Sequence, residues 1–210
     1  MQSPPPRAIP ELAKLPLVVA TPRLELRPLV LADADDIWPH ASNPELPRMM
    51  SWNAHTGVRE TRDFVERQIG ALANGTAITW AIVHDGRCSG CIGLDDITWQ
   101  FRAWRIDRAE LGYWLAPPLW GKGLMSEAAL AATRWGFETL GLHKIKIGCV
   151  DGNVASQKII ERLGFRFLAM FDEDFWRDGR WQHHRRYEMT AAEWSDAART
   201  LRFSKPRPAP

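Results

Sequence analysis

The chain has 210 residues, of which 45% are hydrophobic and 25% are charged, a composition typical of a soluble globular protein with one substantial core. Its 27 basic and 25 acidic residues leave a formal charge of +2, which gives no reason to expect nucleic acid as a partner. No apolar run approaches the length of a membrane span, and three cysteines without a leader peptide favour a cytoplasmic setting.

Both ends of the chain are rich in proline. "MQSPPPRAIP" at residues 1–10 cannot form a regular helix, and "SKPRPAP" at residues 204–210 closes the chain in the same manner. We therefore expect three parts: a proline-rich leader over residues 1–20, a single folded domain over residues 21–190, and a short helix with a loose tail over residues 191–210.

The expected domain begins with a strand and two helices. "RLELRPL" at residues 23–29 alternates leucine with charged residues, which is the pattern of a half-buried strand. "LADADDIWPHA" predicts a short helix that Pro44 ends at the latest. In the second helix, Thr56 is the expected cap and Asn74-Gly75 the expected stop.

Three strands follow. "AITWAIVH" and "CSGCIGLDDI" are joined by Asp85-Gly86-Arg87, and Asp-Gly between two such runs is a strong signal of a hairpin. "RAELGYWL" at residues 108–115 predicts the third strand, which Pro117 and Pro118 end.

The next helix is expected to be largely buried. Its sequence, "GLMSEAALAATRWGFETLG", is mostly apolar or small, with Glu127, Arg134 and Glu138 on one polar stripe and Gly141 as its end. After it, "KIKIGCV" predicts a strand and "NVASQKIIERLG" a helix that ends at a glycine.

A hairpin and a short helix complete the chain. "FRFLAMF" and "QHHRRYEMT" predict strands joined through the turn "RDGR" at residues 177–180, and Thr190 with Glu193 forms a capping box. The order of strands and helices indicates the α/β class, with a mixed sheet covered by helices on both faces.

Two glycines surround a lysine where the buried helix begins, in "LWGKGLMSEA" at residues 119–128. The first turn of a helix has free N–H groups and a positive dipole end, so Gly121 and Gly123 would let its backbone approach an anion, with Lys122 adding charge. The alternative, with about equal weight, is that these residues form only a flexible turn and bind no anion. Neither common nucleotide motif fits, because Gly123 follows Lys122 where a P-loop needs Ser or Thr, and Ser126 stands where a Rossmann fingerprint needs glycine.

The combined motifs resemble the GNAT acetyltransferases, specifically the RimJ/RimL-type branch. They are "RAELGYWLAPPLWGKGLMSEA", "HKIKIGCVDGNVASQKIIERLGF", "DGRW" and "RRYEM", within a resemblance that runs from about Pro22 to Met189. It implies a mixed, mostly antiparallel sheet of about seven strands, and acetyl-CoA as co-substrate. The residues that it assigns to acetyl-CoA are Trp114, Leu115, Trp120, Gly121, Lys122, Gly123, Leu124, Met125, Ser126, Asn153, Ser156 and Lys158.

Departures from the general family pattern narrow the match to this branch. Trp120 and Met125 replace the usual Gln or Arg and the usual small residue, as is familiar in the RimJ/RimL branch. Ile160 stands where many members have a tyrosine that acts as general acid, and an aliphatic side chain cannot donate a proton. The branch often has a serine earlier on this helix, so Ser156 is the expected donor to the thiolate.

Acetyl transfer also needs an oxyanion site and a neutral amine. The resemblance places the oxyanion at a backbone N–H near Leu115, and we favour Glu110 as the base, with an ordinary ion pair to an arginine as the equal alternative. Asp172, Glu173 and Asp174 are competing bases, and attack without a protein base is a further option. Trp52, His55 and Asp174 are the expected acceptor-binding residues.

No metal site is expected. Cys88 and Cys91 have the spacing of half a zinc site, but Cys149 is the only other cysteine. His183 and His184 are neighbours in a strand, so their side chains alternate faces. Arginines at 177, 180, 185 and 186 form a solvated hairpin or a surface for acidic partners.

The sequence therefore predicts an N-acetyltransferase that moves acetyl from acetyl-CoA to a primary amine. A protein N-terminal amine, of the ribosomal-protein type, is the leading acceptor. The alternatives are a small amine (a polyamine, amino sugar or amino acid) and an acetyl-CoA-binding module without turnover. We expect a monomer or homodimer that binds neither nucleic acid nor membranes.

Overall fold

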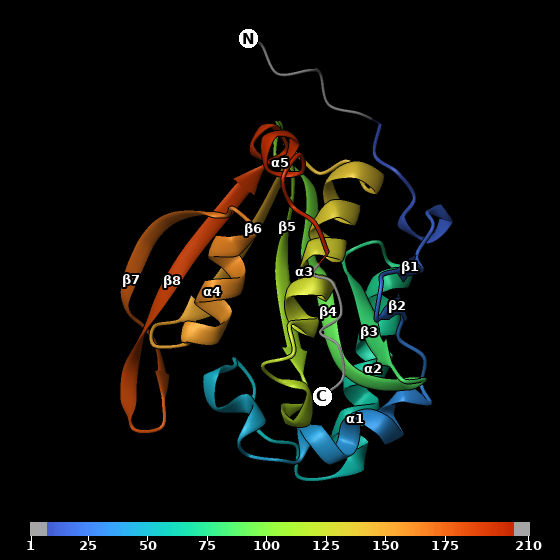
Figure 1. The fold of residues 1–210 in the computed structure, drawn as a ribbon, viewed down its shortest axis with the longest axis vertical. Coiled ribbons are helices and arrows are strands. Elements are labelled where there is room, and N and C mark those ends of the chain that lie inside the picture. Colours follow the sequence, from blue (N-terminus) through green and yellow to red (C-terminus); the bar gives the residue numbers. More distant parts are fainter. Residues whose placement is uncertain (1–7, 204–210) are drawn as a thin grey trace.

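An eight-stranded sheet runs through the structure, a computed structural model that describes residues 8–203 (Figure 1). The strands are β1 Val19–Ala20, β2 Glu25–Pro28, β3 Ile78–His84, β4 Arg87–Phe101, β5 Trp104–Leu115, β6 Lys144–Val150, β7 Arg166–Arg177 and β8 Arg180–Thr190. Their order in space is β1-β2-β3-β4-β5-β6-β8-β7, and only β5 and β6 are parallel neighbours among the described strands. The mixed, mostly antiparallel sheet is confirmed; the short strand β1 was not predicted and accounts for the eighth strand.

Helices cover both faces of the sheet, as expected. They are α1 Asp33–Ala41, α2 Val58–Ala73, α3 Leu124–Arg134, α4 Val154–Arg162 and α5 Ala191–Ala197. A π-helical turn, Trp135–Thr139, continues α3. None of the helices within residues 8–203 is both long and apolar enough to cross a membrane.

The alternation of side chains along β5 separates two apolar cores. Leu111 and Leu115 belong to the larger core, which α3 and α4 complete on one face. Trp114 points the other way and belongs to the smaller core, which it shares with α1 and α2. A pair of helices thus covers each face of the sheet, α3 with α4 on one face and α1 with α2 on the other.

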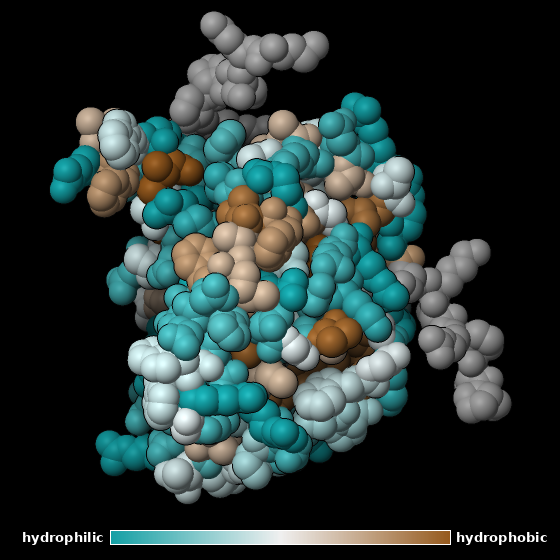
Figure 2. Space-filling view, turned by 90° about the vertical axis from the view of Figure 1, so that its left-hand side faces the viewer, coloured by the Kyte–Doolittle hydropathy of each residue, from teal (hydrophilic) through white to brown (hydrophobic). Residues whose placement is uncertain are grey.

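Two-residue turns fix the register of the predicted hairpins. Asp85 and Gly86 both adopt left-handed φ angles, of 51° and 76°, and His84 pairs with Arg87. Asp178 and Gly179 repeat this geometry between β7 and β8, with φ angles of 52° and 76°. β7 forms the sheet edge, and Figure 2 shows this side of the molecule with hydrophobic spots separated by hydrophilic surface.

One predicted cap is wrong. Gly57, not Thr56, is the N-cap of α2, because the Thr56 N–H and hydroxyl both donate to the Glu60 carboxylate, at 2.9 and 2.6 Å. Residues 1–7 and 204–210, on which most of the loose-end prediction falls, lie outside the described residues. Within the expected leader, the Leu17 carbonyl accepts a hydrogen bond of 2.6 Å from the Trp80 indole, so this part packs on the domain.

The sheet splits between its two parallel strands. Pairing of β5 with β6 runs only from Arg108 with Lys144 to Glu110 with Lys146. Beyond this point β5 continues to Leu115 without β6 as a partner. The split opens a passage between the two faces of the sheet, and residues 111–114 of β5 with residues 148 and 149 of β6 line it.

Candidate active site

Two cavities lie on opposite faces of the sheet and meet at the split. The α3-side cavity, of about 750 Å³, lies between β5, α3 and α4; the α2-side cavity, of about 860 Å³, lies between β4, β5, α2 and the β7–β8 hairpin. The residues that line both are Met49, Met50, Leu111, Gly112, Tyr113, Trp114, Gly148 and Cys149. A molecule in one cavity can therefore reach a molecule in the other through the split.

All twelve residues expected at acetyl-CoA line the α3-side cavity. At its mouth, Gly121 and Gly123 have φ angles of 74° and 76°, a left-handed backbone that glycine adopts without strain. Gly123 is the N-cap of α3, and no side chain caps this helix. The N–H groups of the first turn therefore face the cavity mouth, a suitable place for an anion, while the Lys122 side chain is exposed.

A buried ion pair braces this turn from behind. The Glu127 side chain is fully buried and accepts hydrogen bonds from the Arg23 backbone, the Arg23 Nε and the Thr21 hydroxyl, all at 2.7–2.8 Å. Arg23 also donates to the Lys122 carbonyl at 2.8 Å. Glu127 on the polar stripe is buried, because a partner far away in the chain supplies the charge that its burial requires.

The end of β5 is tied to the same turn. The Trp120 indole donates a hydrogen bond of 2.6 Å to the Leu115 carbonyl. Because β6 has diverged, the β5 backbone between residues 111 and 115 borders the split on that side. Backbone N–H groups are thus present where the two cavities meet.

Two hydroxyl groups meet inside the α3-side cavity. Asn153 caps α4 by accepting a hydrogen bond of 3.1 Å from the Ser156 N–H, and the Ser156 Oγ lies 3.0 Å from the Tyr113 Oη. Ile160, at the position of the family's usual tyrosine, is fully buried in the core. Sequence reasoning missed Tyr113, although the alternation of "ELGYWL" was a signal that it faces α4 rather than α2.

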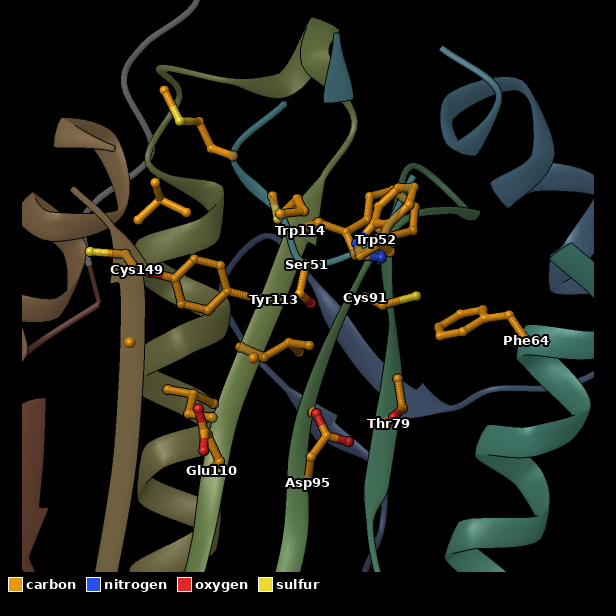
Figure 3. A pocket seen from close by; sticks show the side chains of 18 of the residues that line it. Ser51, Trp52, Phe64, Thr79, Cys91, Asp95, Glu110, Tyr113, Trp114 and Cys149 are labelled. Carbon is orange, nitrogen blue, oxygen red and sulfur yellow. The ribbon is translucent and has the colours of Figure 1, made fainter. Parts of the chain in front are cut away.

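Tyr113 on β5 and Cys149 on β6 both line the split (Figure 3), and burial disfavours ionisation of each. It raises the pKa of Tyr113 well above its ordinary value, against a smaller opposing effect of the Ser156 hydrogen bond. It also raises the pKa of the neighbouring Cys149 thiol to about 11. Both groups are neutral at physiological pH.

Aromatic rings form the upper wall of the α2-side cavity (Figure 3). The ring of Trp52 packs edge-on against Trp114 at a centroid distance of 6.3 Å, and it is tilted against the His55 ring at 5.5 Å. The His55 Nδ1 lies 2.8 Å from the Thr61 hydroxyl, and burial lowers the pKa of His55. Trp52 and His55, both expected to bind the acceptor, therefore line the same cavity.

Carboxylates line the lower part of the same cavity. Glu110 lies there, with an oxygen 3.3 Å from the Arg186 guanidinium. The residue expected to act as the base therefore also forms the ion pair with an arginine that was the alternative to a catalytic role. Of the competing acids, Asp174 lines the cavity and lies 3.2 Å from the His184 Nδ1, whereas Asp172 and Glu173 do not line it. Sequence reasoning missed Asp95, which lines the cavity from β4.

The β7–β8 hairpin reaches across this cavity. Arg177 donates hydrogen bonds through Nη1 to the carbonyls of Met50 and Trp52, more than 120 residues earlier in the chain. Its side chain is 16% exposed. One guanidinium thus ties the loop that carries Trp52 to the β7–β8 hairpin.

The cysteines and the paired histidines have other partners. Within residues 8–203, no group of three or more His, Cys, Asp or Glu side chains is arranged to hold a metal ion. Cys88 and Cys91 lie in the smaller core, where burial raises the pKa of Cys91. His183 contacts Asp172, and His184 contacts Asp174.

Comparison with known proteins gives consistent matches. The model of the acetyltransferase (GNAT) domain family matches residues 23–166. The chain is 31% identical over 148 residues to the uncharacterized N-acetyltransferase p20 of Bacillus licheniformis, covering 70% of this chain and 80% of the relative. It is 33% identical over 85 residues to the ribosomal protein uS5 alanine N-acetyltransferase of Escherichia coli (strain K12), covering 40% and 44%. The fold is similar to that of RimL, a ribosomal L7/L12 alpha-N-protein acetyltransferase solved with coenzyme A, with a TM-score of 0.74 and 21% identity over 82% of this chain and 97% of that chain.

Proposed function

The chain belongs to the GNAT acetyltransferase family and is an acetyl-CoA-dependent N-acetyltransferase, and from this premise we propose that it acetylates the N-terminal amine of a protein. The relative named as a ribosomal protein uS5 alanine N-acetyltransferase supports a protein as the acceptor. We further propose that residues 21–190 form one catalytic domain and that the protein works in the cytoplasm.

The α3-side cavity is the proposed place of acetyl-CoA. The first-turn N–H groups of α3 would bind the pyrophosphate, with Gly121 and Gly123 leaving room for it. The pantetheine arm would then follow β5 past Trp114 and Leu115 to the split. There, a β5 N–H that lacks a β6 partner would donate to the thioester oxygen and stabilise the tetrahedral oxyanion.

Acetyl transfer is proposed to be direct. The pKa of about 11 for Cys149 leaves little thiolate near pH 7, which argues against an acetylated cysteine intermediate. The amine would enter through the α2-side cavity, contact Glu110 and attack the thioester carbon. As the carbon–sulfur bond breaks, Ser156 would protonate the thiolate, with Tyr113 hydrogen-bonded behind it.

The observation that carries the proposal is the meeting of two cavities at the split, which keeps the acetyl donor and the amine on opposite faces of the sheet. Acetyl-CoA binding is tested by calorimetry, and the acceptor by thiol release with a library of ten-residue peptides that differ in their first residue. We expect acetylation confined to the peptide α-amine, located by mass spectrometry. Acetylation of polyamines or amino sugars but of no peptide would contradict this acceptor, and tight binding of acetyl-CoA with no turnover would favour a binding module.

A further inference from the structure

Two carboxylates lie side by side at the bottom of the α2-side cavity. Asp95 on β4 and Glu110 on β5 are direct partners in the antiparallel register, so their side chains leave the same face of the sheet. Both line the cavity, and Figure 3 shows them on neighbouring strands. The Asp95 carboxyl group lies beside the Gly112 backbone, because a Cβ at Gly112 would be 3.4 Å from the Asp95 Oδ2, an ordinary contact distance.

The two carboxylates have different partners. Glu110 accepts a hydrogen bond from Arg186 and lies opposite Lys146 in the β5–β6 register. Asp95 has no hydrogen bond or ion pair with any residue in the described range 8–203. Its carboxyl group is therefore an acceptor that the folded chain leaves unused within the cavity where the amine is proposed to bind.

The surroundings of Asp95 favour its neutral form. Burial raises its pKa to about 6, and the negative charges of Asp96 and Glu110 act in the same direction. Besides Asp95, the charged or titratable side chains that line the cavity are Arg67 from α2, His55 from the loop before it, Cys91 and Asp96 from β4, Glu110 and Tyr113 from β5, Cys149 from β6, and Asp174, Arg177, His184 and Arg186 from the β7–β8 hairpin. Of these, the strand neighbours Asp96 and Glu110 are the ones that act on Asp95 through their charge.

An amine acceptor creates a need for such a group. At neutral pH a protein N-terminus is largely an ammonium, and nitrogen cannot attack a thioester until one N–H bond has broken. A carboxylate that already accepts from an arginine is suited to holding the ammonium in place. A carboxylate without a partner, whose pKa is close to the working pH, is suited to taking the proton.

We propose that Asp95 takes the proton of the acceptor ammonium while Glu110, fixed by Arg186, orients the amine. This assignment rests on the proposed function. The N–H electron pair stays on nitrogen, the proton passes to the Asp95 carboxylate directly or through one water, and the resulting carboxylic acid releases it to solvent after turnover. The second proton that nitrogen loses, from the tetrahedral intermediate, goes to the departing thiolate through Ser156, so the products are the amide, the CoA thiol and one proton.

The kinetic test compares Asp95→Asn and Glu110→Gln with wild type, using a ten-residue peptide that begins with alanine, from pH 5 to 9. Asp196→Asn is the matched control, because Asp196 is an exposed carboxylate on α5 that lines neither cavity. We expect the pH profile of wild-type kcat/KM to have two limbs. One is a fall below pH 6, and the other lies near pH 8, where the peptide's own amine titrates. Asp95→Asn should lower kcat at pH 7 at least 100-fold and lose the limb near pH 6, with an unchanged Kd for acetyl-CoA. Glu110→Gln should mainly raise the peptide KM and keep that limb.

A second measurement does not depend on the acceptor. Titration of the side-chain carboxyl carbons by NMR, with the Asp95 signal assigned by its loss in Asp95→Asn, should give a pKa near 6 in wild type and a lower value in Glu110→Gln. An Asp95 signal that titrates near pH 4, or an Asp95→Asn enzyme within twofold of wild type, would overturn the assignment. Absence of turnover with every peptide contradicts the proposed function instead, which is a different result from turnover that Asp95→Asn leaves intact.

Discussion

The hydroxyl groups of Tyr113 and Ser156 lie 3.0 Å apart and join β5 to α4 inside the α3-side cavity. The serine is therefore one of two adjacent hydroxyl groups, and a tyrosine on β5 lies beside it although Ile160 stands at the position where many family members have one. Because burial raises the pKa of Tyr113, the pair stays protonated at working pH. It can thus donate a hydrogen bond toward a sulfur at the split.

Removal of either hydroxyl should slow the chemical step. We expect Ser156→Ala to lower kcat about 100-fold, within the range for loss of a general acid, and Tyr113→Phe to lower it about 10-fold. If the two act as one chain, the double variant should lose little more than Ser156→Ala alone. Steady-state kinetics with the preferred peptide measure this.

Cofactor binding provides the control for these variants. Asn153, whose side chain caps the Ser156 N–H, keeps α4 in place in both, so the Kd for acetyl-CoA should stay within threefold of wild type. Additive losses in the double variant, or unchanged turnover in Ser156→Ala, would remove the serine from its proposed role.

The Gly-Lys-Gly turn should bind the pyrophosphate through its backbone. Gly123→Ala forces a side chain into a left-handed conformation, at a cost of about 1–2 kcal/mol, and crowds the anion, so we expect the Kd for acetyl-CoA to rise about tenfold or more. Lys122→Ala removes only an exposed charge and should raise it less than threefold. Calorimetry on both variants decides, and an equal or reversed order would contradict a backbone-centred site.

Local patterns predicted most of the fold because each depends on neighbours in the chain. The Asp85-Gly86 turn, the β6 strand and the Thr190–Glu193 capping box follow from sequence alone. The residues that the resemblance assigned to acetyl-CoA likewise all line one cavity. The positions of Glu127 and Asp95 could not be predicted in this way, because each depends on a distant contact or on its absence.

The burial of Glu127 depends on a contact that the pattern of α3 does not reveal. Its helical period places it beside Arg134 and Glu138, yet Arg23 from before β2 lies against it and allows its burial. Asp95 shows the opposite case, since no residue pattern reveals that a carboxylate lacks a partner. Both facts depend on how strands from different parts of the chain are arranged.

The Arg23–Glu127 pair should matter for stability. Arg23→Ala leaves the buried Glu127 carboxylate without its cation, so we expect the free energy of unfolding to fall by about 3–5 kcal/mol. Arg48→Ala, which breaks an exposed pair with Glu45, is the matched control and should cost less than about 1 kcal/mol. Urea unfolding followed by fluorescence gives both values, and similar losses would contradict a special role for the buried pair.

Arg177 should position the acceptor loop without touching acetyl-CoA. In Arg177→Ala the carbonyls of Met50 and Trp52 lose their shared donor, so we expect the peptide KM to rise about tenfold with the Kd for acetyl-CoA unchanged. Arg180→Ala, at an exposed position of the same hairpin, should behave as wild type. Arg177→Lys should recover part of the loss, and an unchanged KM in Arg177→Ala would show that the loop holds its place without this contact.

Asp95 should lower stability at the pH where it is proposed to act. Its pKa rises from an ordinary 3.8 to about 6 on folding, so the unfolded chain loses this proton first as pH increases. Stability is therefore unaffected below about pH 4, falls as pH rises through 6, and above that is lower by roughly 3 kcal/mol, at about 1.4 kcal/mol per pKa unit. Asp95→Asn removes this cost, so it should be more stable than wild type at pH 8 by about 1–3 kcal/mol while being less active. Urea unfolding of both proteins between pH 4 and 8 measures the difference in stability between them. Groups whose effect on stability with pH is opposite, such as Glu188, whose pKa is lowered by Lys144 and Arg166, are present in both proteins and cancel in this difference. If wild type and Asp95→Asn lose the same stability over this range, the carboxyl group is not held near neutral pH, and its proposed part in deprotonating the amine fails with it.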